Sequence, residues 1–84
     1  MTDKFNRRDL SVLGFANGFT LWHYRTGLSS KRLEEKGFFD GIARSLRSGD
    51  IIMVSSASTA GQLLVRHASP KDGVRVTKIT ARSF

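Results

Sequence analysis

The chain has 84 residues and no cysteine, which excludes a disulfide scaffold and any metal site built from thiolates. At this length it forms one domain with a thin core, because so short a chain buries only about 60–65% of the surface that its unfolded form exposes. The formal net charge of +7, from 14 Lys and Arg against 7 Asp and Glu, makes nucleic acid and acidic protein surfaces candidate partners without bearing on the fold.

The chain divides into a short polar segment and a longer patterned one. Residues 1–11 are polar and charged with few apolar anchors, and we expect them to form a mobile N-terminal arm. Residues 12–84 are expected to form a single small β-rich domain, because short apolar runs separated by turn residues recur along this stretch.

The first strand is expected over about residues 12–26. Gly14, Asn17 and Gly18 supply a turn or bulge before its regular part. In that regular part, large apolar side chains alternate onto both faces of the strand, and they include the only Trp of the chain, Trp22. This two-sided pattern favours a strand in a small barrel, or one covered by a second subunit, over a sheet with one solvated face.

Two short helices are expected next. In the first, about residues 30–36, Ser29 or Ser30 can cap the helix, and Gly37 ends this segment. Residues 40–47 are a stronger candidate, because Asp40 is a good N-cap and apolar side chains recur on one face at helical spacing. Helices of this length are not stable alone, so we expect one or both to pack on the sheet.

Three more strands are expected, over about residues 50–56, 62–68 and 74–80. The first is a short apolar run typical of a central buried strand. The last two are joined by a tight turn in which Pro70 presets its φ angle and Gly73 takes the left-handed conformation. The predicted fold class is α+β and mostly β, a small antiparallel sheet or a partly open barrel with one or two short helices packed on it.

No group of residues in the sequence predicts catalysis. The two histidines, His23 and His67, are far apart and lack the spacing of metal ligands. No serine lies in a recognisable nucleophile motif, and no glycine-rich phosphate loop precedes a helix with its lysine. We therefore expect a protein that is not an enzyme and that binds no metal and no cofactor.

The sequence also predicts no contact with a membrane. The longest uninterrupted apolar run, residues 51–54, is far shorter than the about 20 residues that a bilayer requires. Arg7 and Arg8 superficially resemble a twin-arginine export signal, but polar residues interrupt the apolar stretch behind them and no small-residue cleavage site follows. We expect a cytoplasmic protein.

The candidate contact surface combines aromatic and cationic side chains. Aromatic rings interleaved with cations on one strand suit single-stranded nucleic acid, because bases stack on the rings and Arg neutralises phosphate. Core or a protein interface is nevertheless the preferred interpretation of Trp22 and Tyr24, because so short a chain has few large residues from which to build a core. The candidate contact residues are Trp22, Tyr24, Arg25, Phe38, Phe39, Arg44 and Arg47.

Three motifs follow one another along the chain: Trp-x-Tyr-x-Thr, Gly-aromatic-Phe-Asp and Leu-x-x-Gly-Asp-hydrophobic. Their residues are Trp22, Tyr24 and Thr26, then Gly37, Phe38, Phe39 and Asp40, then Leu46, Gly49, Asp50, Ile51 and Ile52. In this order and spacing, over about residues 18–56, the chain resembles a small module of phage and prophage virion proteins and of short uncharacterised α-proteobacterial proteins. The resemblance implies a β-rich assembly or attachment module that acts through protein contacts and has no catalytic residues.

The sequence therefore predicts a non-enzymatic protein-interaction or structural domain that self-associates, with a protein partner whose identity it does not give. Self-association is favoured because two-faced apolar strands in a chain with a thin core leave apolar surface to be covered. The alternative is a small basic nucleic-acid-binding domain, with contacts at Trp22, Tyr24, Arg25, Arg44 and Arg47, whose affinity would fall steeply with salt.

Overall fold

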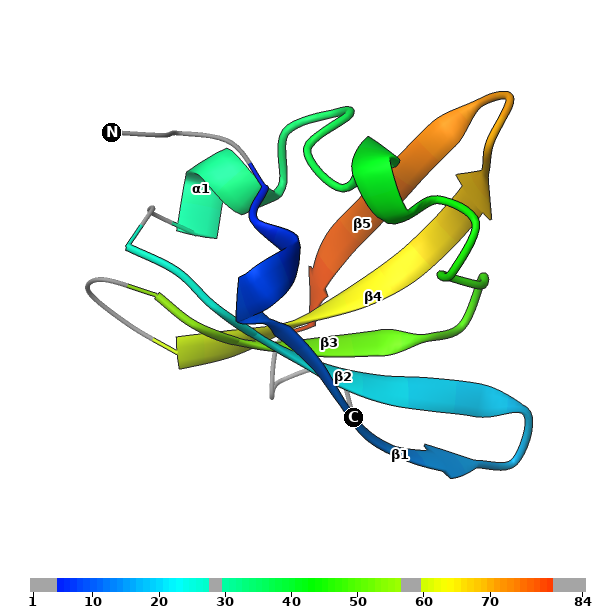
Figure 1. Ribbon diagram of the computed structural model, residues 1–84, viewed down its shortest axis with the longest axis horizontal. Helices are drawn as coiled ribbons and strands as arrows, with labels where there is room; N and C mark the ends of the chain where they lie inside the picture. The colour runs from blue at the N-terminus through cyan, green and yellow to red at the C-terminus, as the bar shows by residue number, and fades with distance from the viewer. Residues whose placement is uncertain (1–4, 28–29, 57–59, 80–84) are drawn as a thin grey trace.

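The structure, a computed structural model, describes residues 5–27, 30–56 and 60–79, apart from the side chains of residues 30 and 31. Its regular elements are strands and single helical turns (Figure 1). The strands are β1 (Leu10–Ala16), β2 (Phe19–Arg25), β3 (Ile51–Ser55), β4 (Ala60–Ser69) and β5 (Gly73–Ile79). The helical turns are η1 (Arg7–Asp9), α1 (Ser30–Leu33) and η2 (Asp40–Ile42). The prediction of a mostly β fold is confirmed.

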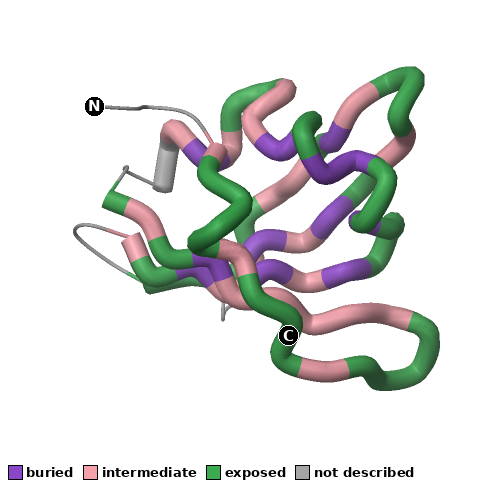
Figure 2. The backbone as a smooth tube through the Cα atoms, viewed as in Figure 1, coloured by how far each residue is buried: buried purple, intermediate pink, exposed green. Residues whose placement is uncertain are grey.

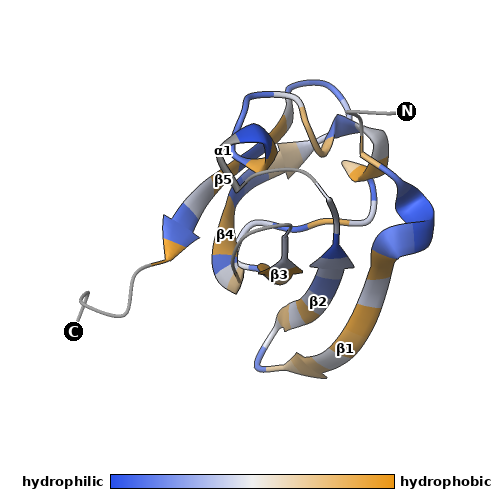
Figure 3. Cartoon of the chain, turned by 90° about the vertical axis from the view of Figure 1, so that its left-hand side faces the viewer, coloured by the Kyte–Doolittle hydropathy of each residue, from blue (hydrophilic) through white to orange (hydrophobic). Residues whose placement is uncertain are grey.

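The strands form one five-stranded sheet in the order β1-β2-β3-β4-β5. Three neighbouring pairs are antiparallel, but β2 and β3 run parallel, so the prediction of an antiparallel sheet is wrong at that pair. Parallel neighbours need a crossover connection, which residues 26–50 supply. The sheet curves around this crossover without closing into a barrel, since β1 and β5 are its two edges (Figure 3).

A hairpin replaces the single strand predicted over residues 12–26. Asn17 and Gly18 have φ angles of 49° and 85°, which a two-residue type I′ turn requires, and this turn joins β1 to β2. A β-bulge interrupts the pairing between Val12 and Gly14. A turn and a bulge therefore do occur near Gly18 and Gly14, as the sequence indicates, but the turn divides the segment into two paired strands.

Both predicted helices are wrong, because each shrinks to a single turn. Within residues 40–47 the backbone hydrogen bonds are mainly of the i to i+3 kind, as from the Ala43 N–H to the Asp40 carbonyl at 3.1 Å. The side chain of Asp40 does not cap this turn. Instead, its Oδ1 accepts the N–H of Val74 in β5 at 2.7 Å, so the residue expected to begin a helix ties the crossover to the sheet.

The crossover covers the concave face of the sheet, as predicted for the helices. Figure 2 shows buried residues both on the middle strands and on the crossover above them. The crossover contributes Leu33, Phe39, Ile42, Ala43 and Leu46 to the core. The sheet contributes Tyr24, Ile52, Val54, Leu63, Val65 and Val74. The core is thus a single cluster between one sheet face and the crossover.

The convex face carries a second apolar row. Leu21, Ile51 and Leu64 are direct cross-strand partners on β2, β3 and β4, and each is partly exposed. Since cross-strand partners share a face and the apolar side chains of the crossover lie on the other one, no described segment covers this row. The two-sided apolar pattern read from the sequence is therefore present in the sheet.

The N-terminal segment differs in part from the mobile arm predicted over residues 1–11. Residues 1–4 lie outside the described part of the chain. Phe5 stacks on Tyr24 with ring centroids 5.2 Å apart, η1 follows, and β1 begins at Leu10. The Asn6 N–H also donates to the Tyr24 hydroxyl at 2.8 Å, so from Phe5 onward this segment packs against the domain.

Candidate functional site

The large apolar side chains that the structure leaves most exposed lie together on β1. Val12, Leu13 and Phe15 are 47%, 55% and 80% exposed, and we call these three residues the hairpin patch. β1 is an edge strand, and residues 10–22 of the hairpin contain no charged residue, in a chain of which 25% is charged. An uncharged apolar edge is what proteins ordinarily avoid unless something binds there.

The bulge determines which way this patch faces. Val12 lies opposite Trp22, and Phe15 lies opposite Thr20, so each shares a face with its partner. Trp22 and Thr20 are two residues apart and therefore lie on the same, concave face. Without the extra residue at Leu13, Val12 and Phe15 would lie on opposite faces. The bulge thus extends the apolar concave face beyond the part that the crossover covers, where Figure 2 shows the hairpin end exposed.

An open cleft lies between the hairpin end and the crossover. We call it the hairpin cleft. The residues that line it are Phe15, Ala16, Asn17, Gly18, Phe19, Thr20, Trp22, Ser45 and Arg47. It combines aromatic surface with one cation, Arg47, and no acidic side chain lines it among the described residues. Such a lining suits either an aromatic side chain of a protein or a stacked base.

Asp50 forms hydrogen bonds with three of the residues that line the hairpin cleft. Its side chain is buried, with 1% exposure, and Oδ1 accepts the Thr20 N–H at 2.9 Å. Oδ2 accepts the Trp22 Nε1–H at 3.0 Å and the Arg47 N–H at 3.1 Å. One carboxylate therefore holds β2, the indole ring and the crossover in register, and the cleft that they form is preorganised.

The aromatic residues predicted as contacts divide between core and surface. Tyr24 and Phe39 are 1% exposed, so neither can contact a partner. Phe38 is half-buried and packs edge-on against both, while the Arg32 guanidinium lies 5.8 Å from its ring centroid. Together with Phe5 these rings form one aromatic cluster on the concave face. Of the predicted aromatic contacts, only Trp22 lines the hairpin cleft.

The predicted cationic contacts do not converge on one site. Arg44 and Arg47 are exposed on the crossover, and Arg47 alone lines the hairpin cleft. Arg25 is exposed at the far end of β2, where it lines a polar cleft with Asp9 and His23. The sequence reasoning missed the hairpin patch, although the uncharged stretch that flanks the Asn-Gly turn could have signalled it.

Two polar clusters bring a histidine close to a hydroxyl or a carboxylate group. In the polar cleft, His23 Nε2 lies 3.1 Å from Ser55 Oγ, which is the distance of a nucleophile from its base. A working triad also needs a third group to orient the imidazole, and among the described residues the hydrogen bond of the His23 ring is the one to Ser55. No three His, Cys, Asp or Glu side chains gather to hold a metal ion within the described part of the chain.

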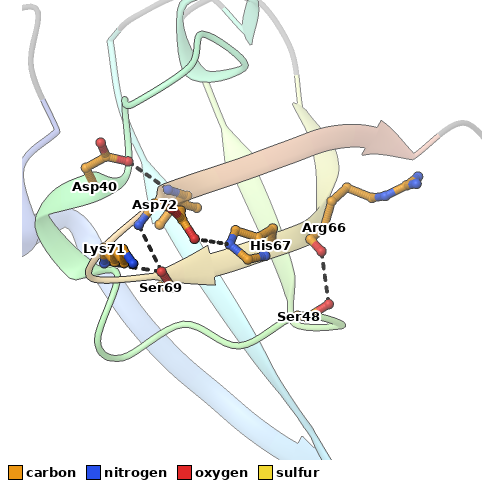
Figure 4. A network of polar contacts seen from close by, with 8 residues as sticks. Asp40, Ser48, Arg66, His67, Ser69, Lys71 and Asp72 are labelled. Carbon is orange, nitrogen blue, oxygen red and sulfur yellow. Dashed lines mark hydrogen bonds and ion pairs between the residues drawn. The ribbon is translucent and has the colours of Figure 1, made fainter.

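The second polar cluster, at the β4–β5 turn, stabilises the fold. Ser69 Oγ accepts the N–H groups of Lys71 and Asp72 at 3.2 and 2.9 Å, and Asp72 lies 3.6 Å from His67 (Figure 4). The His67–Asp72 pair is exposed on both sides, so it is not a site for buried proton transfer. These bonds form a turn that closes on itself rather than a cavity for a ligand.

We expect the buried hydroxyl of Tyr24 to make the stability of the fold depend on pH. Burial raises the pKa of Tyr24 above its ordinary value of 10.0, and the Asn6 hydrogen bond opposes this shift only in part. The unfolded chain therefore loses the tyrosine proton at lower pH than the folded one. We expect the stabilising contribution to be complete below about pH 10 and to be lost as pH rises through the folded pKa.

Denaturant unfolding at about pH 9 and about pH 11 measures this dependence, and the absorbance of the phenolate follows a single group because Tyr24 is the only tyrosine. Tyr24→Phe is the control, and its stability should fall less over the same range. A phenolate that forms at the ordinary pKa in the folded protein would contradict the expectation.

Comparison of the chain with protein-family models, with curated proteins and with solved structures found no match. In the described part of the chain, no helix has the length and apolar character needed to cross a membrane.

Proposed function

We propose that this chain is a non-enzymatic protein-interaction or structural module whose contact surface is the hairpin patch. The observation that carries the proposal is Phe15, a phenylalanine 80% exposed on an uncharged edge strand. Leaving such a side chain exposed forfeits about 1.5–3 kcal/mol of stabilisation from burial. This loss is large for a chain with a thin core, because the core supplies little stability to offset it. The resemblance to virion modules implies the same kind of function, assembly or attachment through protein contacts.

A second candidate function is single-stranded nucleic-acid binding in the hairpin cleft. The specific observation in its favour is that Phe15, Trp22 and the cation Arg47 line one open cleft. A base could stack on the exposed phenyl ring while the guanidinium contacts a phosphate. Against it, Tyr24 is part of the core, and Arg25 lines a different cleft from Arg47, so these two described cations do not form one track for a nucleic-acid backbone.

One cross-linking experiment tests both candidates. Phe15 is replaced by benzoylphenylalanine, which attacks C–H bonds of whatever lies on it when irradiated, in cells that make the protein. We expect a defined protein adduct from position 15 and none from the same residue placed at Lys71, an exposed position in the β4–β5 turn. An adduct with nucleic acid would support the second candidate instead, and the absence of any specific adduct would overturn both.

A further inference from the structure

We propose that the partner of the hairpin patch is a second copy of this chain, packed about a two-fold axis. The inference rests on the proposed function and names its partner. Its first support is that a protruding side chain and a cleft lie side by side on one surface. Phe15 projects from the hairpin, and the hairpin cleft beside it is lined by Phe19 and Trp22. A two-fold contact requires that pairing, since each copy must offer both complementary parts.

Charge supplies the second support. Two copies of a chain with a net charge of +7 repel one another unless they meet where neither carries charge. Residues 10–22 are such a region, because they contain no charged side chain, and Arg47 at the rim is the one cation among the described residues that line the hairpin cleft beside them. The opposite edge of the sheet differs, since β5 carries Arg75 and Lys78, both exposed, and charged edge residues discourage pairing. An acidic partner would instead be expected to bind a cationic surface, which the hairpin patch is not.

The size of the surface sets the strength of the contact. Specific protein interfaces usually bury about 800 Å² on each side, and one phenylalanine supplies on the order of 150–250 Å². Three exposed apolar side chains and one cleft per copy therefore reach only the lower part of this range. We expect a weak dimer in equilibrium with the monomer, with Phe15 of each copy seated against Trp22 of the other.

Trp22 reports on this contact directly, because it lines the hairpin cleft and is the only tryptophan. Sedimentation equilibrium should give a mass that rises from one copy towards two with concentration. Over the same range, acrylamide should quench the Trp22 fluorescence less as the second copy seals the cleft. Phe15→Ser should raise the dissociation constant about a hundredfold, at least about tenfold for each of the two rings lost.

Two further variants make the result decisive. Ile51→Thr changes the apolar row on the convex face and should leave the dimer intact, whereas Leu13→Lys should dissociate it by placing like charges in the contact. If Ile51→Thr abolished the dimer and Phe15→Ser did not, the convex face would be the interface and the proposal would be wrong. Circular dichroism checks that each variant is folded.

The failure of this inference can be told from that of the proposed function. A chain that stays monomeric at the highest attainable concentration, with unchanged quenching of Trp22, rules out the second copy. If benzoylphenylalanine at position 15 still gave an adduct with a different protein, the interaction module would stand with another partner. If it gave no adduct either, both would fall.

Discussion

Replacing Asp50 with alanine should lower the free energy of unfolding by about 3–5 kcal/mol. The carboxylate is 1% exposed and accepts three N–H groups, from Thr20, Trp22 and Arg47. Alanine leaves these three part-buried donors without an acceptor, and a fully buried donor left unpaired costs about 1–3 kcal/mol. A domain of this length has only about 4–13 kcal/mol of stability in total, so Asp50→Ala should be largely unfolded at moderate urea concentrations.

Asp50→Asn keeps the shape of the side chain and changes its hydrogen bonds, so it measures what the hydrogen bonds contribute to stability. The amide oxygen can replace Oδ2 and accept from Trp22 and Arg47, but the NH₂ group then faces the Thr20 N–H, and two donors meet. We therefore expect Asp50→Asn to lie between the native chain and Asp50→Ala in stability. Trp22→Phe, which removes one donor and leaves the carboxylate two, should cost about 1 kcal/mol.

Urea unfolding followed by circular dichroism measures the whole series, since Trp22 itself is changed in one variant. The same carboxylate shapes the hairpin cleft, so the loss should not be limited to stability. If Asp50→Ala is still folded at low urea concentration, the quenching of Trp22 should increase, because the indole loses its hydrogen bond in that variant. An Asp50→Ala chain within about 1 kcal/mol of the native one would show that Asp50 does not organise this end of the sheet.

Long-range contacts explain where the sequence was an incomplete guide. The buried strand beginning at Ile51 and the turn at Gly73 were predictable, because an apolar run and a Pro-x-x-Gly turn are local signals. Asp50 was readable only as a cap or turn residue, since its partners Thr20 and Trp22 are 30 and 28 positions away. The spacing of chemical groups along the chain does not record which distant donors a carboxylate will meet.

Long-range contacts also explain why the sequence predicted a helix in the crossover and missed part of the candidate site. A good N-cap followed by helical spacing favours a helix, but Asp40 is engaged with Val74 of β5 and the local hydrogen bonds tighten to a 3₁₀ turn. Of the predicted contact residues, Trp22 and Arg47 meet at the hairpin cleft, whereas Tyr24 is core. Phe15 was not foreseen, because only the bulge in β1 brings it onto the face of Trp22.

The contact between Asp40 and β5 leads to the second large effect, at Gly73. Gly73 has a φ angle of +84°, and a Cβ at this position would lie 2.7 and 2.9 Å from the two oxygens of Asp40. The left-handed backbone alone costs an alanine about 1–2 kcal/mol. Asp40 can move aside, but it then gives up the Val74 N–H, a bond to a charged group worth about 1.5–3 kcal/mol. We expect Gly73→Ala to lose about 3–4 kcal/mol.

Gly18 provides a matched control, and Asp40 closes a double-mutant cycle. Gly18 has a φ angle of +85° with nothing within 4 Å of the added Cβ, so Gly18→Ala should cost only the about 1–2 kcal/mol of the backbone. In an Asp40→Ala background the carboxylate is absent, and Gly73→Ala should then cost no more than Gly18→Ala does. The difference between the two backgrounds, measured by urea unfolding, is the coupling between Asp40 and Gly73. Equal costs at Gly73 and Gly18 in the native background would mean that the crossover is not held to the sheet at this point.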